Sequence, residues 1–169
     1  QDRRIAPWDL RRAAYWSVFA GSFGHTYGHR SFIAWMRKDE TYKWGAHIPW
    51  YESLDAPGAN QMRHLRTLME SNSLIDHAPD ASLLADAGPR GKGHLQATRA
   101  SDGSAVLVYS PLGKPIPMQL DKFTTGPVVT SWFDPRTGER TPCGTFETSG
   151  IRTFQPPSSG EDRDWVLVL

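Results

Sequence analysis

The second half of the chain consists of short segments in which apolar and polar residues alternate, and this pattern limits the fold more than any other feature. Between Leu95 and Arg99 the period is two, and Asp102-Gly103 supplies a hairpin turn before the next apolar segment. Short strands separated by proline and glycine predict an antiparallel β-sandwich. Further strands are predicted at Ser104–Tyr109, Ile116–Leu120, Val128–Phe133, Thr141–Phe146, Ile151–Phe154 and Trp165–Leu169.

The first half of the chain shows the three-to-four-residue spacing of helices. One helix is predicted from Asp9 to Ala20, with Asp9 as its N-cap and with apolar residues on nearly all of its faces. A second helix is predicted over Pro57–Glu70, because proline suits the first turn of a helix. One face of this second helix carries an apolar stripe made of Met62, Leu65, Leu68 and Met69.

The change of period divides the chain into two parts. Its 169 residues suffice for one ordinary domain or two small ones. We predict an α+β chain in which residues 1–86 form a helical part and residues 87–169 form the β-sandwich. The glycine- and proline-containing segment Asp86–Gly93 is the candidate linker between them.

Charge and cysteine content exclude several classes of function. Lys and Arg total 19 and Asp and Glu total 18, so bulk electrostatics favours neither nucleic acid nor a membrane surface as a partner. No apolar stretch is long enough to span a bilayer, and the polar start of the chain does not resemble a signal peptide. Cys143 is the only cysteine, which excludes an internal disulfide. Without an initiating methionine, we expect the chain to be a piece of a longer protein.

The predicted first helix ends at glycine and leads into a segment of Gly, His, Thr and Tyr. Phe23–Tyr27 is predicted as a short buried strand, and His25, Tyr27 and His29 are the candidate ligand-binding residues. The two histidines are four residues apart, as in helical metal sites, but the neighbouring glycines disfavour a helix and no glutamate lies between them. A polar cleft that recognises a ligand is the preferred interpretation, with a metal site and buried structural histidines as the alternatives. The sequence predicts no cofactor.

Three tryptophans lie in one irregular region, and a polar turn lies in the second half. Trp35, Trp44 and Trp50 could form a carbohydrate-stacking site, although core filling beneath a long loop is the commoner explanation. The run Asp134-Pro135-Arg136-Thr137-Gly138 has the composition of a tight turn between strands, which is favoured over a calcium or phosphate site.

Several motifs in order resemble the apiosidase-like glycoside hydrolases. These motifs are Arg12-Ala13-Ala14-Tyr15-Trp16-Ser17-Val18-Phe19-Ala20-Gly21, Gly24-His25-Thr26-Tyr27-Gly28, Pro57-Gly58-Ala59-Asn60-Gln61-Met62, Trp132-Phe133-Asp134-Pro135-Arg136-Thr137-Gly138 and Asp164-Trp165-Val166-Leu167-Val168-Leu169. The resemblance spans nearly the whole chain. It implies the C-terminal end of a (β/α)8 barrel, with its last strand and flanking helices, followed by a small β domain labelled collagen-binding.

The resemblance also implies roles for the candidate residues. His25, Tyr27 and His29 would lie at the C-terminal end of the last barrel strand, where barrel enzymes build their sites, and would line a sugar site with Trp35. The catalytic carboxylates of such barrels lie on earlier strands, so the resemblance implies that this chain holds no catalytic residue and is inactive alone. Its partners would be a polysaccharide or oligosaccharide and the missing N-terminal portion of the barrel. An extracellular or periplasmic location is expected of the family.

Two other functions stay open for the β half. It could be a non-catalytic module that binds carbohydrate or collagen, or it could be a structural support for the barrel. The structural role is preferred, because the sequence specifies no aromatic platform in this half.

Overall fold

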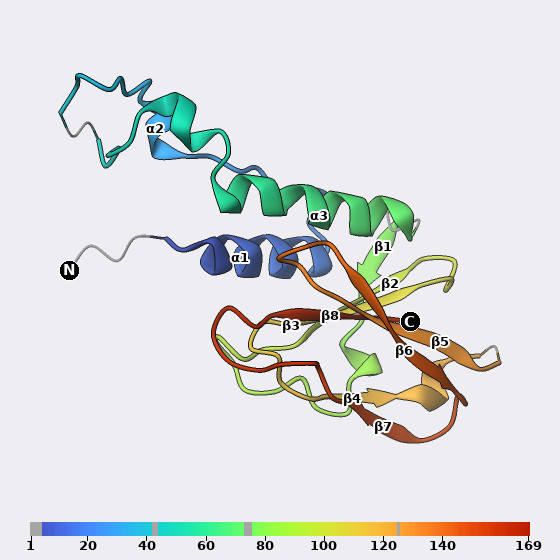
Figure 1. Cartoon of the computed structure of the whole chain (residues 1–169). Helices are drawn as coiled ribbons and strands as arrows, with labels where there is room; N and C mark the ends of the chain where they lie inside the picture. Colours follow the sequence, from blue (N-terminus) through green and yellow to red (C-terminus); the bar gives the residue numbers. More distant parts are fainter. Residues whose placement is uncertain (1–4, 42–43, 73–75, 125) are drawn as a thin grey trace.

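The computed structural model describes residues 5–41, 44–72, 76–124 and 126–169 and has three layers. Two helices cover one face of a six-stranded sheet, and a two-stranded sheet covers the other face (Figure 1). A lobe, made of residues 30–41 and 44–53, carries a short helix and extends from the helical layer, away from both sheets (Figure 1). Antiparallel sheets combined with helices confirm the α+β class.

The helical layer consists of α1 (Pro7–Phe19) and α3 (Pro57–Ser71), and the lobe contains α2 (Arg30–Ile33). The prediction of Asp9 as the N-cap of α1 is wrong, because Pro7 occupies the first helical position and Ala6 the cap. Asp9 lies one turn later, where its Oδ2 accepts a hydrogen bond of 3.1 Å from the backbone N–H of Ala6. A carboxylate at this position also interacts favourably with the positive end of the helix dipole.

Helix α1 is buried on one side only, which corrects the prediction that nearly all its faces are covered. The buried side contains Trp8, Arg11, Tyr15 and Val18, spaced three or four residues apart, whereas Ala13 on the opposite side is exposed. Helix α3 uses the predicted stripe: Leu65 and Leu68 are buried, and Met62 and Met69 pack against the same core. The two helices therefore form a single layer with one solvent-exposed face.

The six-stranded sheet has the strand order β1-β2-β3-β8-β5-β6, and all its neighbouring strands are antiparallel. Its strands are β1 (His77–Pro79), β2 (Gln96–Ala100), β3 (Val106–Ser110), β5 (Val128–Phe133), β6 (Arg140–Phe146) and β8 (Trp165–Val168). The two-stranded sheet pairs β4 (Ile116–Gln119) with β7 (Ile151–Phe154). Each strand predicted from the alternating pattern is present. Strand β1 was not predicted, since three residues that include a proline carry no periodic signal.

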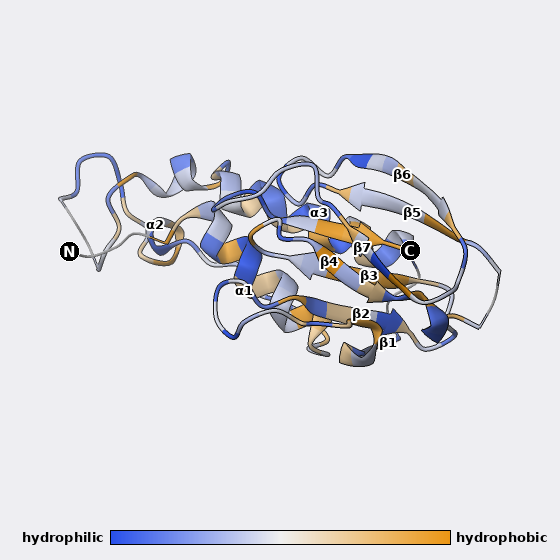
Figure 2. Cartoon of the chain, turned by 90° about the horizontal axis from the view of Figure 1, so that it is seen from below, coloured by the Kyte–Doolittle hydropathy of each residue, from blue (hydrophilic) through white to orange (hydrophobic). Residues whose placement is uncertain are grey.

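The central strands β3 and β8 contribute to two hydrophobic cores. Alternate residues of β3 point to opposite faces, so that Leu107 and Tyr109 meet the helices while Val106 and Val108 meet the two-stranded sheet. Strand β8 follows the same rule. Hydrophobic residues gather on the inner strands, whereas the edge strand β6 is largely hydrophilic (Figure 2).

The predicted buried strand at Phe23–Tyr27 is absent from the structure. Residues 22–29 form neither helix nor strand and bend at Phe23, whose side chain is fully exposed. A strand is stabilised by hydrogen bonds to a neighbour, and none of the described strands pairs with this segment. Among the described residues, no helix has the length and apolar character required to cross a membrane.

Candidate functional site

The segment at residues 22–29 carries three of the four predicted site residues. His25 is exposed, whereas Tyr27 is half-buried against Gly58 at the start of α3. His29 is also half-buried and precedes α2, where its Nδ1 accepts a 3.2 Å hydrogen bond from the backbone N–H of Ser31. Burial lowers the pKa of His29, and the charge of His47 lowers it further. Burial raises the pKa of Tyr27.

The fourth predicted residue, Trp35, belongs to a group of rings that we call the aromatic cluster: Phe32, Trp35, Trp50 and Tyr51. Ring centroids lie 5.4 Å apart for Phe32 and Trp35, 4.9 Å apart for Trp35 and Trp50, and 5.8 Å apart for Trp50 and Tyr51. Trp35 is 57% exposed. Elsewhere in the lobe, Trp44 is 75% exposed, so core filling is wrong for both of these tryptophans.

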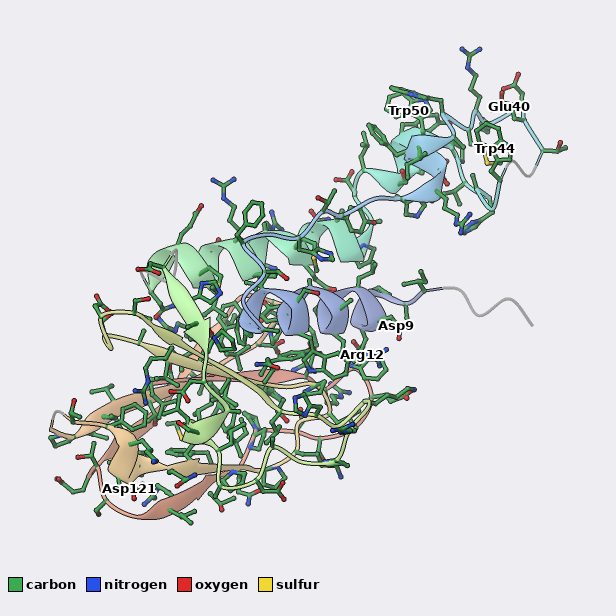
Figure 3. All side chains as sticks on the ribbon, turned by 180° about the vertical axis from the view of Figure 1, so that it is seen from behind. Asp9, Arg12, Glu40, Trp44, Trp50 and Asp121 are labelled. Carbon is green, nitrogen blue, oxygen red and sulfur yellow. The ribbon has the colours of Figure 1, made fainter. Side chains whose placement is uncertain are left out.

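The backbone of the lobe fixes where these rings point. Trp35 and Trp44 have φ angles of 47° and 49°, a left-handed conformation that bulky residues rarely adopt. The backbone N–H of Trp50 donates a 2.8 Å hydrogen bond to the carbonyl of Met36, which ties the two arms of the lobe together. In the same lobe, Ala34, Met36 and Ala46 form a small buried core. Both Trp44 and Trp50 lie in the lobe, far from the β layers (Figure 3).

The structure connects the four predicted residues only loosely. Within the ranges that the structure describes, no hydrogen bond or ring contact joins any two of His25, Tyr27, His29 and Trp35. Trp35 instead contacts Phe32 and Trp50, which the prediction did not include as site residues. The described residues also contain no group of three His, Cys, Asp or Glu side chains arranged to hold a metal ion.

Sequence reasoning missed a buried ion pair between the helical layer and the β layers. Arg11 of α1 is 1% exposed, and Asp164, immediately before β8, is 0% exposed. The Arg11 Nε donates to Asp164 Oδ2 at 3.0 Å, and its Nη2 donates to Oδ1 at 2.7 Å. Burial alone would lower the pKa of Arg11, but the hydrogen bonds and charges of Asp164 and Asp162 outweigh it and raise the pKa. A signal was present in the sequence, since Arg11 interrupts the apolar stripe of its helix.

The predicted tight turn at residues 134–138 is confirmed, and it contacts both the helices and a neighbouring loop. The backbone N–H of Gly138 donates to the carbonyl of Asp134 at 2.8 Å. The guanidinium of Arg136 donates twice to the Asp134 carboxylate, each time at 2.7 Å, and once to the carbonyl of Asp162 at 2.9 Å. Gly138 lies directly against the ring of His64 in α3.

Two surface pockets of about 390 and 400 Å³ lie away from the predicted site residues. The first lies beside the C-terminus and is lined by residues such as Ser131, Arg140 and Leu169. The second lies between the starts of α1 and α3 and the loop at residues 161–162, where Arg11, Gln61 and Asp162 contribute polar groups. These polar groups already bond to one another, because Arg11 donates to both Gln61 and Asp162.

Comparison with known protein families gives two matches that together cover nearly the whole chain. Residues 78–169 match the family described as "Putative collagen-binding domain of a collagenase". Residues 1–76 match the family described as "Apiosidase-like, catalytic domain". No curated protein matches the chain.

Two solved structures resemble the chain closely. One, titled "Glycoside hydrolase", is 36% identical with a TM-score of 0.88, and the match covers 96% of this chain and 36% of that protein. The other, a glycoside hydrolase family 5 protein from Bacteroides vulgatus ATCC 8482, is 34% identical with a TM-score of 0.91. That match covers 99% of this chain and 37% of the relative. The chain thus spans about a third of the length of these relatives.

Proposed function

Because the chain belongs to this collagen-binding-domain family and carries an apiosidase-like segment before that domain, we propose that it is the C-terminal portion of a larger glycoside hydrolase that acts on polysaccharide. The observation that carries the proposal is the match of nearly the entire chain to solved glycoside hydrolases about three times its length. The likeness extends without a break from the helical layer into the β layers.

We assign the helical layer to the end of a (β/α)8 barrel. Helices α1 and α3 pack side by side, and the chain between them includes the segment at residues 22–29. In a barrel, this segment would pair on both sides with strands of the remaining protein, which would also cover the exposed Phe23. The C-terminal ends of barrel strands carry the active sites of such enzymes, and His25, Tyr27 and His29 end this segment.

In the larger enzyme, these residues would bind and orient the sugar. The imidazole and phenol groups would exchange hydrogen bonds with sugar hydroxyls, and Trp35 would contact the apolar face of a ring. Glycoside hydrolysis requires a carboxylic acid and a second carboxylate flanking the scissile bond. We propose that the rest of the enzyme supplies both carboxylates, so that this chain alone does not hydrolyse its substrate.

The test compares the 169-residue chain with the longer gene product that contains it. Both are incubated with a panel of plant and microbial polysaccharides, and the release of reducing ends is measured. We expect the longer protein to release reducing ends and the chain alone to release none. Turnover by the chain alone would contradict the assignment of the carboxylates, and inactivity of the longer protein on every substrate would contradict the proposed function.

A second proposal concerns the β layers, which we assign to structural support of the helices. One continuous core joins α1 and α3 to the six-stranded sheet, and the rings of Tyr15 and Tyr109 stack within it at a centroid distance of 5.0 Å. Two indole N–H groups of α1 add hydrogen bonds to β-layer carbonyls, from Trp8 to Pro111 at 2.9 Å and from Trp16 to His94 at 3.0 Å. Such an interface favours a fixed support over a mobile binding module.

Co-sedimentation distinguishes support from binding. The chain is mixed with fibrillar collagen or with insoluble cellulose, xylan or chitin, and the bound fraction is measured. A supporting role predicts that collagen does not retain the chain. Any retention by a polysaccharide should disappear in a variant changed in the lobe and persist in one changed at the exposed β-layer residues Val129 and Ile151. Retention that depends on Val129 or Ile151 would favour a binding module instead.

A further inference from the structure

The aromatic cluster of the lobe brings four rings together, and two of them, Phe32 and Trp35, are 43% and 57% exposed. We propose that it is a binding subsite for a neutral oligosaccharide, in which one sugar ring stacks on Trp35 and Phe32 while Trp50 holds Trp35 in place. This inference rests on the proposed function and extends it, because it names the ligand class and a subsite that works without the catalytic carboxylates.

The geometry of the rings suits a flat, partly apolar ligand. Phe32 and Trp35 have ring centroids 5.4 Å apart and are inclined at 35° to each other, and with 43% and 57% of their surface exposed both rings offer apolar area to a ligand. Trp50 meets Trp35 nearly edge-on, at 63°, and so supports it without occupying the same plane. A sugar ring presents C–H groups on its faces, which are attracted to the negative face of an aromatic ring, and hydroxyl groups at its edge, which stay solvated.

The surface is preorganised rather than flexible. The left-handed backbone of Trp35 is strained, and the surrounding packing must offset this strain for the conformation to persist. The hydrogen bond between Trp50 and Met36 and the small buried core of the same lobe provide that packing. An aromatic surface that is fixed before binding loses little conformational entropy when the ligand arrives.

The charges around the cluster favour a neutral ligand over an acidic one. The lobe carries cationic and anionic side chains in nearly equal number, so it does not create a strong field of one sign. Two of these charged groups also form local hydrogen bonds: Nη1 of Arg30 donates to the carbonyl of Trp44 at 3.1 Å, and the Glu40 carboxylate accepts from the backbone N–H of Arg37 at 2.9 Å. Binding would thus depend on stacking and sugar hydroxyls rather than on ion pairs.

Titration of the chain with defined oligosaccharides tests the proposal. The probes are cellohexaose, xylohexaose and mannohexaose, with tetragalacturonate as the acidic comparison, and calorimetry together with tryptophan fluorescence reports binding. We expect at least one neutral probe to bind, and we expect Trp35→Ala to weaken that binding about tenfold. Trp44→Ala is the matched control, since Trp44 is an exposed tryptophan of the same lobe outside the cluster. It should leave the affinity unchanged within about twofold.

Three outcomes would overturn the inference: no neutral probe binds, only tetragalacturonate binds, or Trp44→Ala weakens binding as much as Trp35→Ala. Circular dichroism of each variant confirms that the fold is intact. Acrylamide quenching provides a separate check, because a Trp35 indole shielded in the longer gene product would show that protein, not sugar, covers the cluster. None of these outcomes alters the reducing-end assay of the longer protein, so the two proposals fail separately.

Discussion

Arg11 and Asp164, which are 153 residues apart in the sequence, form a bidentate ion pair with almost no exposure to solvent. The Tyr109 hydroxyl also donates to Asp164 Oδ2 at 3.1 Å, so the carboxylate is bonded from a helix and from the central sheet. This pair joins the two layers at a point where hydrophobic contact alone would be expected.

Loss of one partner of this pair should destabilise the fold strongly. Arg11→Met leaves the Asp164 carboxylate buried without its cation, and we expect the free energy of unfolding in urea to fall by about 3 kcal/mol. The double variant Arg11→Met/Asp164→Leu should recover part of that loss, because it removes the uncompensated charge. Arg66→Met, which breaks an exposed pair with Glu70, is the control and should leave the unfolding midpoint nearly unchanged. Equal effects of Arg11→Met and Arg66→Met would refute this account.

The stacked tyrosines should respond in opposite ways to loss of their hydroxyl groups. The Tyr15 hydroxyl is buried with no hydrogen-bond partner, so Tyr15→Phe should leave the free energy of unfolding unchanged or raise it by up to about 1 kcal/mol. Tyr109→Phe removes a hydrogen bond to a buried carboxylate and should lower it by about 1–2 kcal/mol. Both variants keep the ring contact, and chemical denaturation measures each. A clear loss of stability in Tyr15→Phe would indicate a partner for its hydroxyl.

Gly138 should tolerate a side chain less well than a glycine of the same backbone conformation. Its φ is 78°, and a Cβ at this position would clash with the His64 ring. Gly103 has a φ of 75° but open space around it, so Gly103→Ala measures the backbone strain alone, about 1 kcal/mol. Gly138→Ala should cost clearly more in thermal unfolding, and adding His64→Ala should remove the excess. Identical costs at both glycines would mean that the turn moves away from α3 freely.

His64 should make the fold less stable in mild acid. Burial lowers its pKa, and the charge of Arg63 lowers it further despite the opposing charge of Asp134. Since the folded pKa lies below that of the unfolded chain, the unfolded state binds the proton first. The stability contribution is therefore complete above about pH 6.5 and is lost as the pH falls through the folded pKa. His64→Gln should reduce the slope of unfolding free energy between about pH 7 and 5. The exposed His25→Gln is the control, and an unchanged slope in His64→Gln would contradict the assignment.

The strands could be predicted from the sequence because their signal is local. Alternation and turn residues predicted both bounds of the strands Val128–Phe133 and Ile151–Phe154 correctly, and the apolar stripe predicted α3. The prediction of a strand at Phe23–Tyr27 is wrong because the signal for a strand is not wholly local. Its prediction needed a neighbour to accept its hydrogen bonds, and pairing depends on segments that the local pattern does not contain.

The candidate site was only partly predictable. The aromatic-rich loop left carbohydrate stacking open but favoured core filling, because the exposure of Trp35 and its contacts with Phe32 and Trp50 depend on a strained backbone that composition does not reveal. Arg11 was missed because a single charge on an apolar stripe has no evident partner until the fold brings Asp164 beside it.

The two matched families meet at His77, the first residue of β1, yet the sheet that begins there shares its core with the helices before it. The boundary between the two sequence families therefore does not coincide with a boundary between hydrophobic cores. A β domain carried into another protein would bring Leu107, Tyr109 and Val166 with it, and these side chains would face water. Any new host must then provide a helical surface with a matching apolar stripe, which restricts the proteins in which this domain can be inherited.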